Sequence, residues 1–241
     1  MRHFVSLIFI LIVLSACGEM NRTTLLSPTA SLPSTQKPSV LPTIVSSETP
    51  ALTPFSTLVP SSLILAEFPL EIGTIWEYEA EISYQDPNDY VELLTWTGTV
   101  TDRVLDKRAE PDGKIVFTVQ EDLEPTPPQS VWRQSRMFEY TISGDGIYDG
   151  GMKVFQYPLE DNQSWQVFAG FEYEMTTQYI GKVIIPYGEL DNCYNFFVVT
   201  GPDTSIKTFC TGIGFVEYFY THHGTPQDEK FVLSSFNPGE P

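Results

Sequence analysis

Carboxylate side chains are the groups in this chain whose type and spacing come nearest to catalytic chemistry. Glu77, Glu79 and Glu81 alternate along one segment, and Glu172 and Glu174 alternate along another. A pair of carboxyl groups can act as general acid and general base in the hydrolysis of a glycosidic bond. The chain holds 31 acidic residues, so such pairs also arise from composition alone. We therefore interpret both groups as solvated sheet faces, with a hydrolase as the alternative.

Two other groups could bind a metal or move a proton. His222 and His223 are adjacent, and neighbouring residues of a strand or turn point in different directions, which favours a surface loop. Asp145–Gly150 resembles part of a calcium loop but lacks the distal Glu of an EF-hand, which favours a turn. The nucleophile-elbow, Walker, Rossmann and zincin motifs are absent from the sequence. The sequence therefore predicts no catalytic, cofactor-binding or metal-binding residue.

Cys193 and Cys210 could form a disulfide if the chain is exported. They flank Gly201-Pro202, which is typical of a hairpin turn. If that pair sits at the centre of the turn, Thr200 faces Asp203, and the same register puts the two cysteines opposite each other. A bridge there would contribute about 3 kcal/mol in the chain-entropy model. Two free buried thiols are the alternative, and a metal site has less support because no second ligand pair lies nearby.

The segments that must position these residues show a period of two. In Thr74–Tyr84 one face carries aromatic and apolar side chains and the other carries the glutamates, the pattern of a half-buried antiparallel strand. Similar runs predict further strands at Tyr90–Leu105, Lys114–Gln120, Val131–Ser143, Phe171–Ile180, Cys193–Thr200, Ser205–Cys210, Phe215–Tyr220 and Glu229–Phe236. From Glu67 onward no window predicts a sustained helix. The predicted fold class is mainly β, with antiparallel sheets forming a curved sheet, a sandwich or a half-barrel.

A short motif occurs twice. Phe68-Pro69-Leu70-Glu71 is followed by Trp76, and Tyr157-Pro158-Leu159-Glu160 is followed at the same spacing by Trp165. We interpret this as two repeated β-meanders, residues 67–156 and 157–241, with coincidence as the alternative. Each aromatic residue and Trp would then clamp the start of a meander onto its own core.

Composition divides the chain before Glu67. Residues 18–66 contain 7 Pro, 9 Ser and 8 Thr, whereas all 4 Trp and all 12 Tyr follow. Such a segment buries too little apolar surface to fold, so residues 17–66 are predicted to form a disordered, semi-stiff tether and residues 67–241 a β-domain. The net charge is −18, which opposes binding to nucleic acid and to anionic lipid surfaces.

The N-terminus resembles that of bacterial lipoproteins. A short basic start leads into the apolar run Phe4–Leu14, and Leu14-Ser15-Ala16-Cys17 resembles a lipobox. The resemblance implies that residues 1–16 are a signal peptide and that Cys17 is acylated, palmitate included. It also implies a protein of the cell envelope, outside the cytoplasm and anchored to a membrane through its N-terminal lipid. An ordinary secretory signal is the alternative.

The β-domain resembles a loosely defined group of uncharacterised exported bacterial β-proteins. This resemblance implies no activity. It rests on short motifs of a structural kind: Pro69, Leu70, Gly73, Trp76 and Tyr78, then Val183, Pro186, Gly188 and Cys193, then Gly212, Gly214 and Val216.

Two functions of different classes follow. The first is a non-catalytic binding or envelope-interaction module, in which aromatic residues of a curved sheet bind a glycan, an apolar ligand or an envelope protein. Trp96, Trp132 and Tyr148 are its candidate residues. The second is a hydrolase of envelope or extracellular polymers that uses a carboxylate pair. A cleft with two carboxyl groups and a raised pKa would distinguish the hydrolase from an apolar groove.

Overall fold

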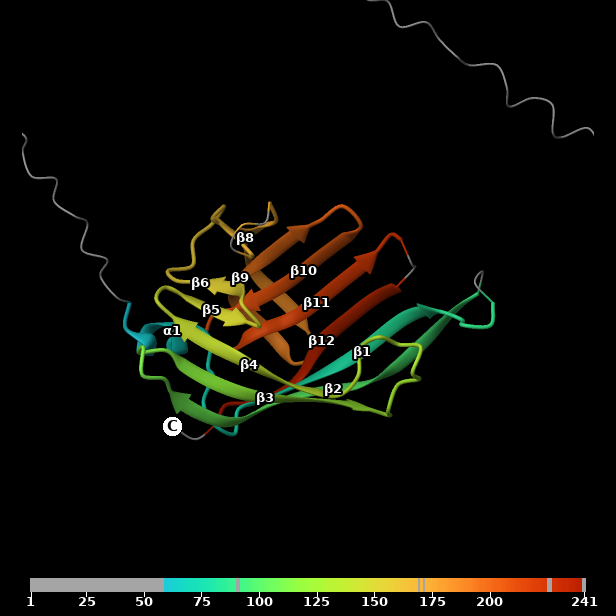
Figure 1. Ribbon diagram of the computed structural model, residues 1–241, viewed down its shortest axis with the longest axis horizontal. Coiled ribbons are helices and arrows are strands. Elements are labelled where there is room, and N and C mark those ends of the chain that lie inside the picture. The colour runs from blue at the N-terminus through green and yellow to red at the C-terminus, as the bar shows by residue number, and fades with distance from the viewer. Residues whose placement is uncertain (1–58, 90–91, 169, 171, 225–226, 240–241) are drawn as a thin grey trace, which may run out of the picture. The chain divides into compact units, whose positions relative to one another are not determined.

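The computed structural model describes residues 59–89, 92–168, 170, 172–224 and 227–239. The predicted signal peptide, Cys17 and the tether up to residue 58 lie outside the described residues. Within the described part, one helix precedes twelve strands (Figure 1). No helix in this part is long and apolar enough to cross a membrane.

All twelve strands belong to one antiparallel sheet. In chain order the elements are α1 (Ser61–Glu67), β1 (Ile75–Gln85), β2 (Leu93–Ala109), β3 (Ile115–Glu124), β4 (Arg136–Ser143), β5 (Gly146–Asp149), β6 (Met152–Gln156), β7 (Ser164–Gln166), β8 (Glu174–Ile185), β9 (Gly188–Val199), β10 (Asp203–Cys210), β11 (Gly214–His222) and β12 (Gln227–Asn237). The order across the sheet is β6-β5-β4-β3-β2-β1-β12-β11-β10-β9-β8-β7. The chain therefore builds outward from β1 to β6 and returns from the far edge until β12 pairs with β1.

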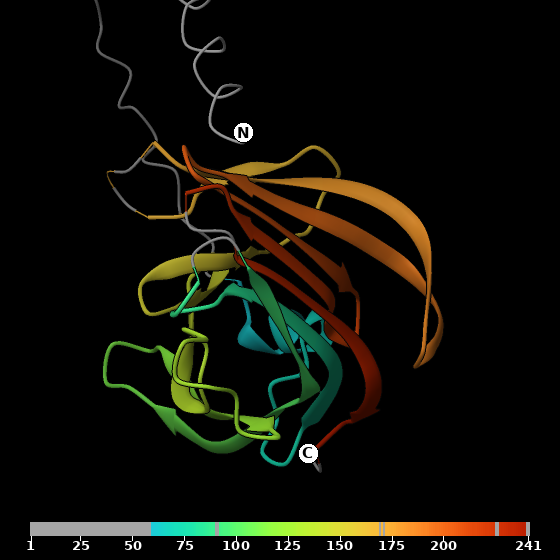
Figure 2. The ribbon, with the colours of Figure 1, turned by 90° about the vertical axis from the view of Figure 1, so that its right-hand side faces the viewer.

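The sheet curves until its two outermost strands meet, and Figure 2 shows the strands wrapping around a common interior (Figure 2). The backbone N–H of Lys153, on β6, donates to the carbonyl of Val167, just after β7, over 2.8 Å. Nε1 of Trp165 donates to the carbonyl of Lys153 over 2.9 Å. The mainly β, antiparallel prediction is confirmed, and among its forms the structure has a nearly closed curved sheet.

Strand β1 shows how the sequence pattern fixes the two faces. Trp76, Tyr78 and Ile82 are buried, whereas Glu79 and Glu81 are exposed. Successive side chains of a strand point to opposite faces, so the period of two places the aromatic residues inside. The predicted alternation of this strand is confirmed.

Phe68 is the centre of the aromatic core. Its ring makes edge contacts with Trp76, Phe209 and Phe215, at centroid distances of 6.0, 5.7 and 5.4 Å. Gly214 permits this packing, because a Cβ there would lie 2.7 Å from the Phe68 ring and its φ is +104°. A residue just outside the first strand thus joins strands from both halves of the sheet.

Three short strands, β5, β6 and β7, and the helix α1 were not predicted from the sequence. The folded part begins before Glu67, because α1 buries Ile64 completely. Asp145–Gly150 was expected to be a turn, which is wrong: its central residues form β5 between two glycine turns. Ile147 is fully buried there, so apolar burial holds the segment in the sheet. Elements this short contain too few residues to show a period.

Each predicted repeat contributes six strands, β1 to β6 and β7 to β12, and the duplication itself stays a prediction. The expectation that each Trp clamps its own meander is wrong. Nε1 of Trp76 donates to the carbonyl of Ile213 over 2.6 Å, and Trp165 donates to Lys153. Each bond reaches into the other half because the curved sheet gives both halves one shared interior.

The hairpin of β9 and β10 has the predicted register. The N–H of Thr200 donates to the carbonyl of Asp203 over 2.9 Å. Cys193 and Cys210 are cross-strand partners, and their Sγ atoms are joined by a disulfide of 2.05 Å. Both residues are fully buried, so the bridge ties two adjacent strands inside the core.

Candidate functional site

The curved sheet surrounds a cavity of about 250 Å³ that is partly open to solvent. Aromatic side chains form much of its wall, among them Trp76, Tyr78, Tyr218 and Phe231. Charged side chains of both signs also line it. This volume corresponds to roughly eight water molecules. The cavity is the site where aromatic and charged groups of the described residues converge.

Charged residues reach the cavity because they occupy inward-facing strand positions. On β2, Asp102 lies between the buried residues Val100 and Val104. On β3, Glu121 lies between Val119 and Leu123, both buried. Residues two apart share a face, so these two carboxyl groups point the same way as their apolar neighbours. The signal that could have identified these two residues in the sequence is a charged residue within an otherwise apolar alternation.

Glu121 and Glu229 hold one arginine between them. Nη2 of Arg133 contacts Oε2 of Glu121, and Nη1 of Arg133 lies 3.3 Å from Oε2 of Glu229. Nε of Arg136 donates to Oε1 of Glu121 over 3.1 Å. The two glutamates are 1% and 0% exposed, so both charges are buried and paired.

Aromatic rings cover the cations of the site. The guanidinium of Arg133 lies 4.6 Å from the ring centroid of Phe231 and 5.6 Å from that of Tyr218. Nζ of Lys207 lies 5.1 Å from the centroid of Phe215 and 5.5 Å from that of Tyr218. Burial lowers the pKa of Lys207. The rings supply part of the stabilisation that water would otherwise give these cations.

Asp102 carries an enclosed carboxyl oxygen that no described residue satisfies. It lies directly opposite Glu121 in the pairing of β2 and β3. Its Oδ1 is enclosed and has no hydrogen-bond partner among the described residues. Burial, with the charge of Glu121 as the next cause, raises the pKa of Asp102 to about 7. Asp149, a further wall residue, has its pKa raised by burial too.

The cavity has a partly exposed rim. Trp132 lies between β3 and β4 and is 57% exposed, and the side chain of Arg136 is 50% exposed. The Trp132 ring makes an edge contact with Tyr220 of β11, at a centroid distance of 6.0 Å. Both rim residues also line the cavity. A ligand entering from solvent would meet these two side chains first.

Of the three predicted aromatic candidates, the structure brings only Trp132 to this cavity. Trp96 is 6% exposed, and its Nε1 donates to the carbonyl of Pro125 over 3.0 Å. Its expected binding role is wrong, because an inward position on β2 makes it part of the core. Tyr148 lines a separate surface depression, together with Lys114.

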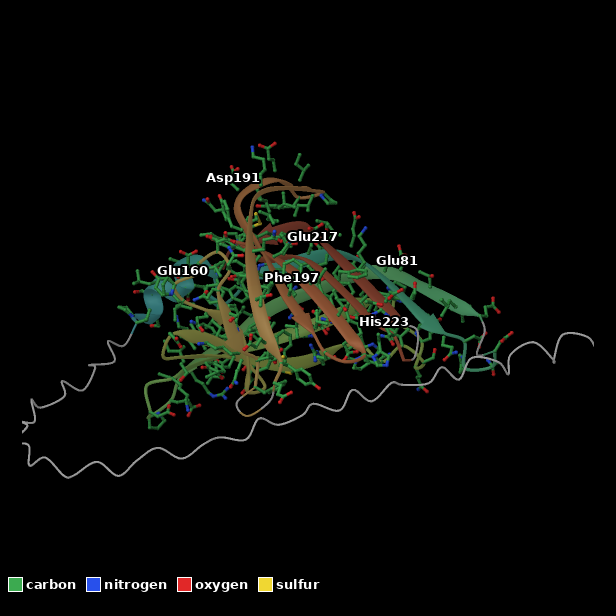
Figure 3. All side chains as sticks on the ribbon, turned by 90° about the horizontal axis from the view of Figure 1, so that it is seen from above. Glu81, Glu160, Asp191, Phe197, Glu217 and His223 are labelled. Atoms are coloured by element: carbon green, nitrogen blue, oxygen red, sulfur yellow. A yellow bond between two sulfur atoms is a disulfide. The ribbon has the colours of Figure 1, made fainter. Side chains whose placement is uncertain are left out.

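The carboxylates singled out in the sequence do not gather at one site. Glu79, Glu81, Glu172 and Glu174 are exposed, and Glu77 points to the outer face of β1 as well. Figure 3 shows Glu81 apart from Glu160, which lies between β6 and β7, and from Asp191 on β9 (Figure 3). The interpretation of these residues as solvated faces is confirmed by their exposure.

His222 is the last residue of β11, and its Nδ1 contacts Oδ1 of Asp203. The hydroxyl of Tyr220 donates to the same oxygen over 2.8 Å. The hydrogen bond to His222 lowers the pKa of Asp203. Within the described residues, no group of three His, Cys, Asp or Glu side chains could hold a metal ion. The polar cluster therefore ties β10 to β11.

No protein-family model and no curated protein matches this chain. Among solved structures, the chain is similar to a Bacteroides fragilis protein described as exported and with a YmcC-like fold. The identity is 11% and the TM-score 0.40, over 71% of this chain and 98% of that one. It is also similar to a Parabacteroides distasonis protein described as a lipoprotein, at 12% identity and a TM-score of 0.38, over 70% of this chain and 97% of that one. Likenesses of this size assign neither function nor location.

Proposed function

We propose that this protein is an exported lipoprotein, anchored through an acylated Cys17, whose β-domain binds a small molecule in its interior cavity without catalysing a reaction. The observation that carries the binding role is the cavity itself. Its wall combines aromatic surface with a few charged groups, which is the usual composition of a small-molecule site.

The cavity volume of about 250 Å³ favours a small ligand over a polymer. A hydrolase of envelope polymers needs an open cleft in which a chain can lie across two carboxyl groups. The raised pKa of Asp102 is a property expected of a catalytic acid. Its neighbour Glu121 is bound by Arg133 and Arg136, so it is not available as the second catalytic group. These pairings support binding over hydrolysis.

The anchoring part of the proposal rests on the lipobox-like sequence before Cys17. Its test is metabolic labelling of the producing bacterium with an alkyne analogue of palmitate. The wild-type chain should take up the label and sediment with membranes. The Cys17→Ala variant should lose the label and leave the membrane fraction. Labelling that persists in this variant would contradict the proposed anchor.

The binding part is tested with indole, a neutral aromatic probe of a size that suits the cavity. Residues 17–241 carrying Cys17→Ser are labelled with ¹⁵N and titrated with indole in an NMR experiment. Shifts should concentrate on amides of wall residues such as Val100, Val119 and Phe231. The NMR signals of outer-face amides, such as that of Glu81, should not change. Shifts confined to the outer face, or none at millimolar indole, would contradict a binding cavity.

A further inference from the structure

The cavity wall has an excess of acid. Among the described residues, the carboxyl side chains of the wall are Asp102, Glu121, Asp149 and Glu217, and its cations are Arg133, Arg136 and Lys207. Glu229 lies behind Arg133 and adds another carboxyl group. The whole chain is acidic as well, with a net charge of −18. The overall field therefore attracts cations and repels anions.

Each cation of the wall contacts a carboxylate or an aromatic ring, although Nε of Arg133 has no hydrogen-bond partner among the described residues. Arg133 pairs with Glu121 and Glu229, and Arg136 pairs with Glu121. Lys207 lies over two aromatic rings. An anionic ligand would have to compete with these contacts.

Asp102, in contrast to the two arginines, forms no ion pair with another described residue. No hydrogen bond or ion pair to another described residue satisfies its Oδ1, although Trp76 and Glu121 flank it on the adjacent strands. An enclosed carboxyl oxygen without a donor is unfavourable, and a positively charged donor placed beside it removes that penalty. The group that Asp102 lacks is therefore a cationic hydrogen-bond donor.

From this arrangement we infer that the ligand is a small organic ammonium ion with an aromatic or apolar body, its nitrogen paired with Asp102. The inference rests on the proposed function and names the ligand class of the same cavity. The aromatic wall suits such a ligand twice, because the rings contact its body and their faces attract its charge. Trp132 at the rim offers a further ring face.

Calorimetry with three probes of similar size tests this inference. Residues 17–241 carrying Cys17→Ser are titrated at pH 8 with 2-phenylethylamine, 2-phenylethanol and 3-phenylpropionate, which are cationic, neutral and anionic. The amine should bind at least about tenfold more tightly than the alcohol, as a charge-assisted bond predicts. The anion should bind most weakly.

Two variants assign the effect to Asp102. Asp102→Asn should lower the affinity for the amine by about tenfold or more and leave the alcohol unchanged. Glu81→Gln makes the same change of charge on the exposed face of β1 and should leave both affinities unchanged. Circular dichroism of each variant shows whether the sheet is intact. If Asp102→Asn does not fold, the wild-type ranking of the three probes still decides the inference.

The outcomes separate this inference from the proposed function. If the alcohol or the anion binds as tightly as the amine, the ammonium class is wrong, while indole shifts on wall amides would still support a binding cavity. If the amine binds but Asp102→Asn retains the affinity, the assigned carboxyl group is wrong. If neither indole nor any of the three probes binds, both proposals fail.

Discussion

Asp102 on β2 lies directly opposite Glu121 on β3, so two carboxyl groups occupy one pair of facing positions inside the sheet. Like charges in directly opposite positions destabilise a sheet. Arg133 and Arg136 neutralise Glu121, and neither forms an ion pair with Asp102 in the described part of the chain. The arrangement leaves one member of the pair available to a ligand at the expense of stability.

The pH dependence of stability should reveal this pair. The pKa of Asp102 is raised from its ordinary value of 3.8 to about 7, so the folded state binds more protons than the unfolded state between these values. The contribution of Asp102 to the free energy of unfolding is therefore favourable at low pH, and it is lost as pH rises from about 4 to about 7. Urea unfolding of Asp102→Asn should show a gain on the order of 2 to 4 kcal/mol over wild type at pH 8. At pH 4 the gain should be near zero.

The difference between wild type and variant isolates Asp102 from the other groups that titrate. The charged groups facing it are Glu121, Arg133, Arg136 and Lys207. Glu81→Gln on the outer face should show no such pH-dependent gain. A wild type that is more stable than Asp102→Asn at pH 8 would mean that the carboxylate has a partner in the folded protein.

Removing Arg133 should strongly destabilise the fold. Arg133→Met leaves Glu121 and Glu229 buried, with one cation fewer between them. Breaking a buried ion network in this way typically costs about 3 to 5 kcal/mol. Denaturant unfolding at pH 8 measures the loss. The control is Lys182→Met, which removes an exposed pair with Glu189 and should cost less than about 1 kcal/mol. Equal effects of the two variants would refute a buried network.

The disulfide should stabilise the hairpin of β9 and β10. Cys193 and Cys210 are 17 residues apart, which corresponds to about 3 kcal/mol in the chain-entropy model. Replacing both by Ala should lower the free energy of unfolding by about 2 to 4 kcal/mol. Dithiothreitol should destabilise the parent chain, carrying Cys17→Ser, by a similar amount and leave the double variant unaffected. If the parent chain and the double variant are equally stable after reduction and after oxidation of the unfolded parent chain, no bridge forms.

Two tryptophans should respond differently to truncation. Trp132 is exposed at the rim, so Trp132→Ala should change the free energy of unfolding by less than about 1 kcal/mol. The same substitution should lower the affinity for 2-phenylethylamine. Trp96 is buried, so Trp96→Ala should cost about 3 to 5 kcal/mol. Thermal unfolding and calorimetry of both variants measure these effects. A large loss of stability in Trp132→Ala would place that ring in the core instead.

Much of the fold was predictable because the period of two is strong in its long strands. Trp76 and Tyr78 on β1 identify the inner face, and Gly201-Pro202 fixes the register that pairs the cysteines. The shortest elements were not predictable, since β5 and α1 contain too few residues to show a period. The closing of the sheet depends on hydrogen bonds between residues far from β1, which no local pattern reveals.

The site was harder to predict than the fold. Acidic residues are so frequent that the outer glutamates of β1 attracted attention, while the informative feature was a charge within an apolar face. Asp102 and Glu121 each interrupt an inward-facing row. Arg133 precedes β4 and Arg136 is its first residue, and both reach Glu121 only after folding. Their role depends on tertiary contacts that sequence spacing does not contain.

The most direct test is a crystal structure of residues 17–241, carrying Cys17→Ser, grown with 2-phenylethylamine. The amine should lie inside the cavity, with its nitrogen within hydrogen-bond distance of the Asp102 carboxylate and its ring against Tyr218 and Phe231. A cavity that holds only water in the presence of saturating amine, or an amine bound solely on the outer face, would contradict this prediction.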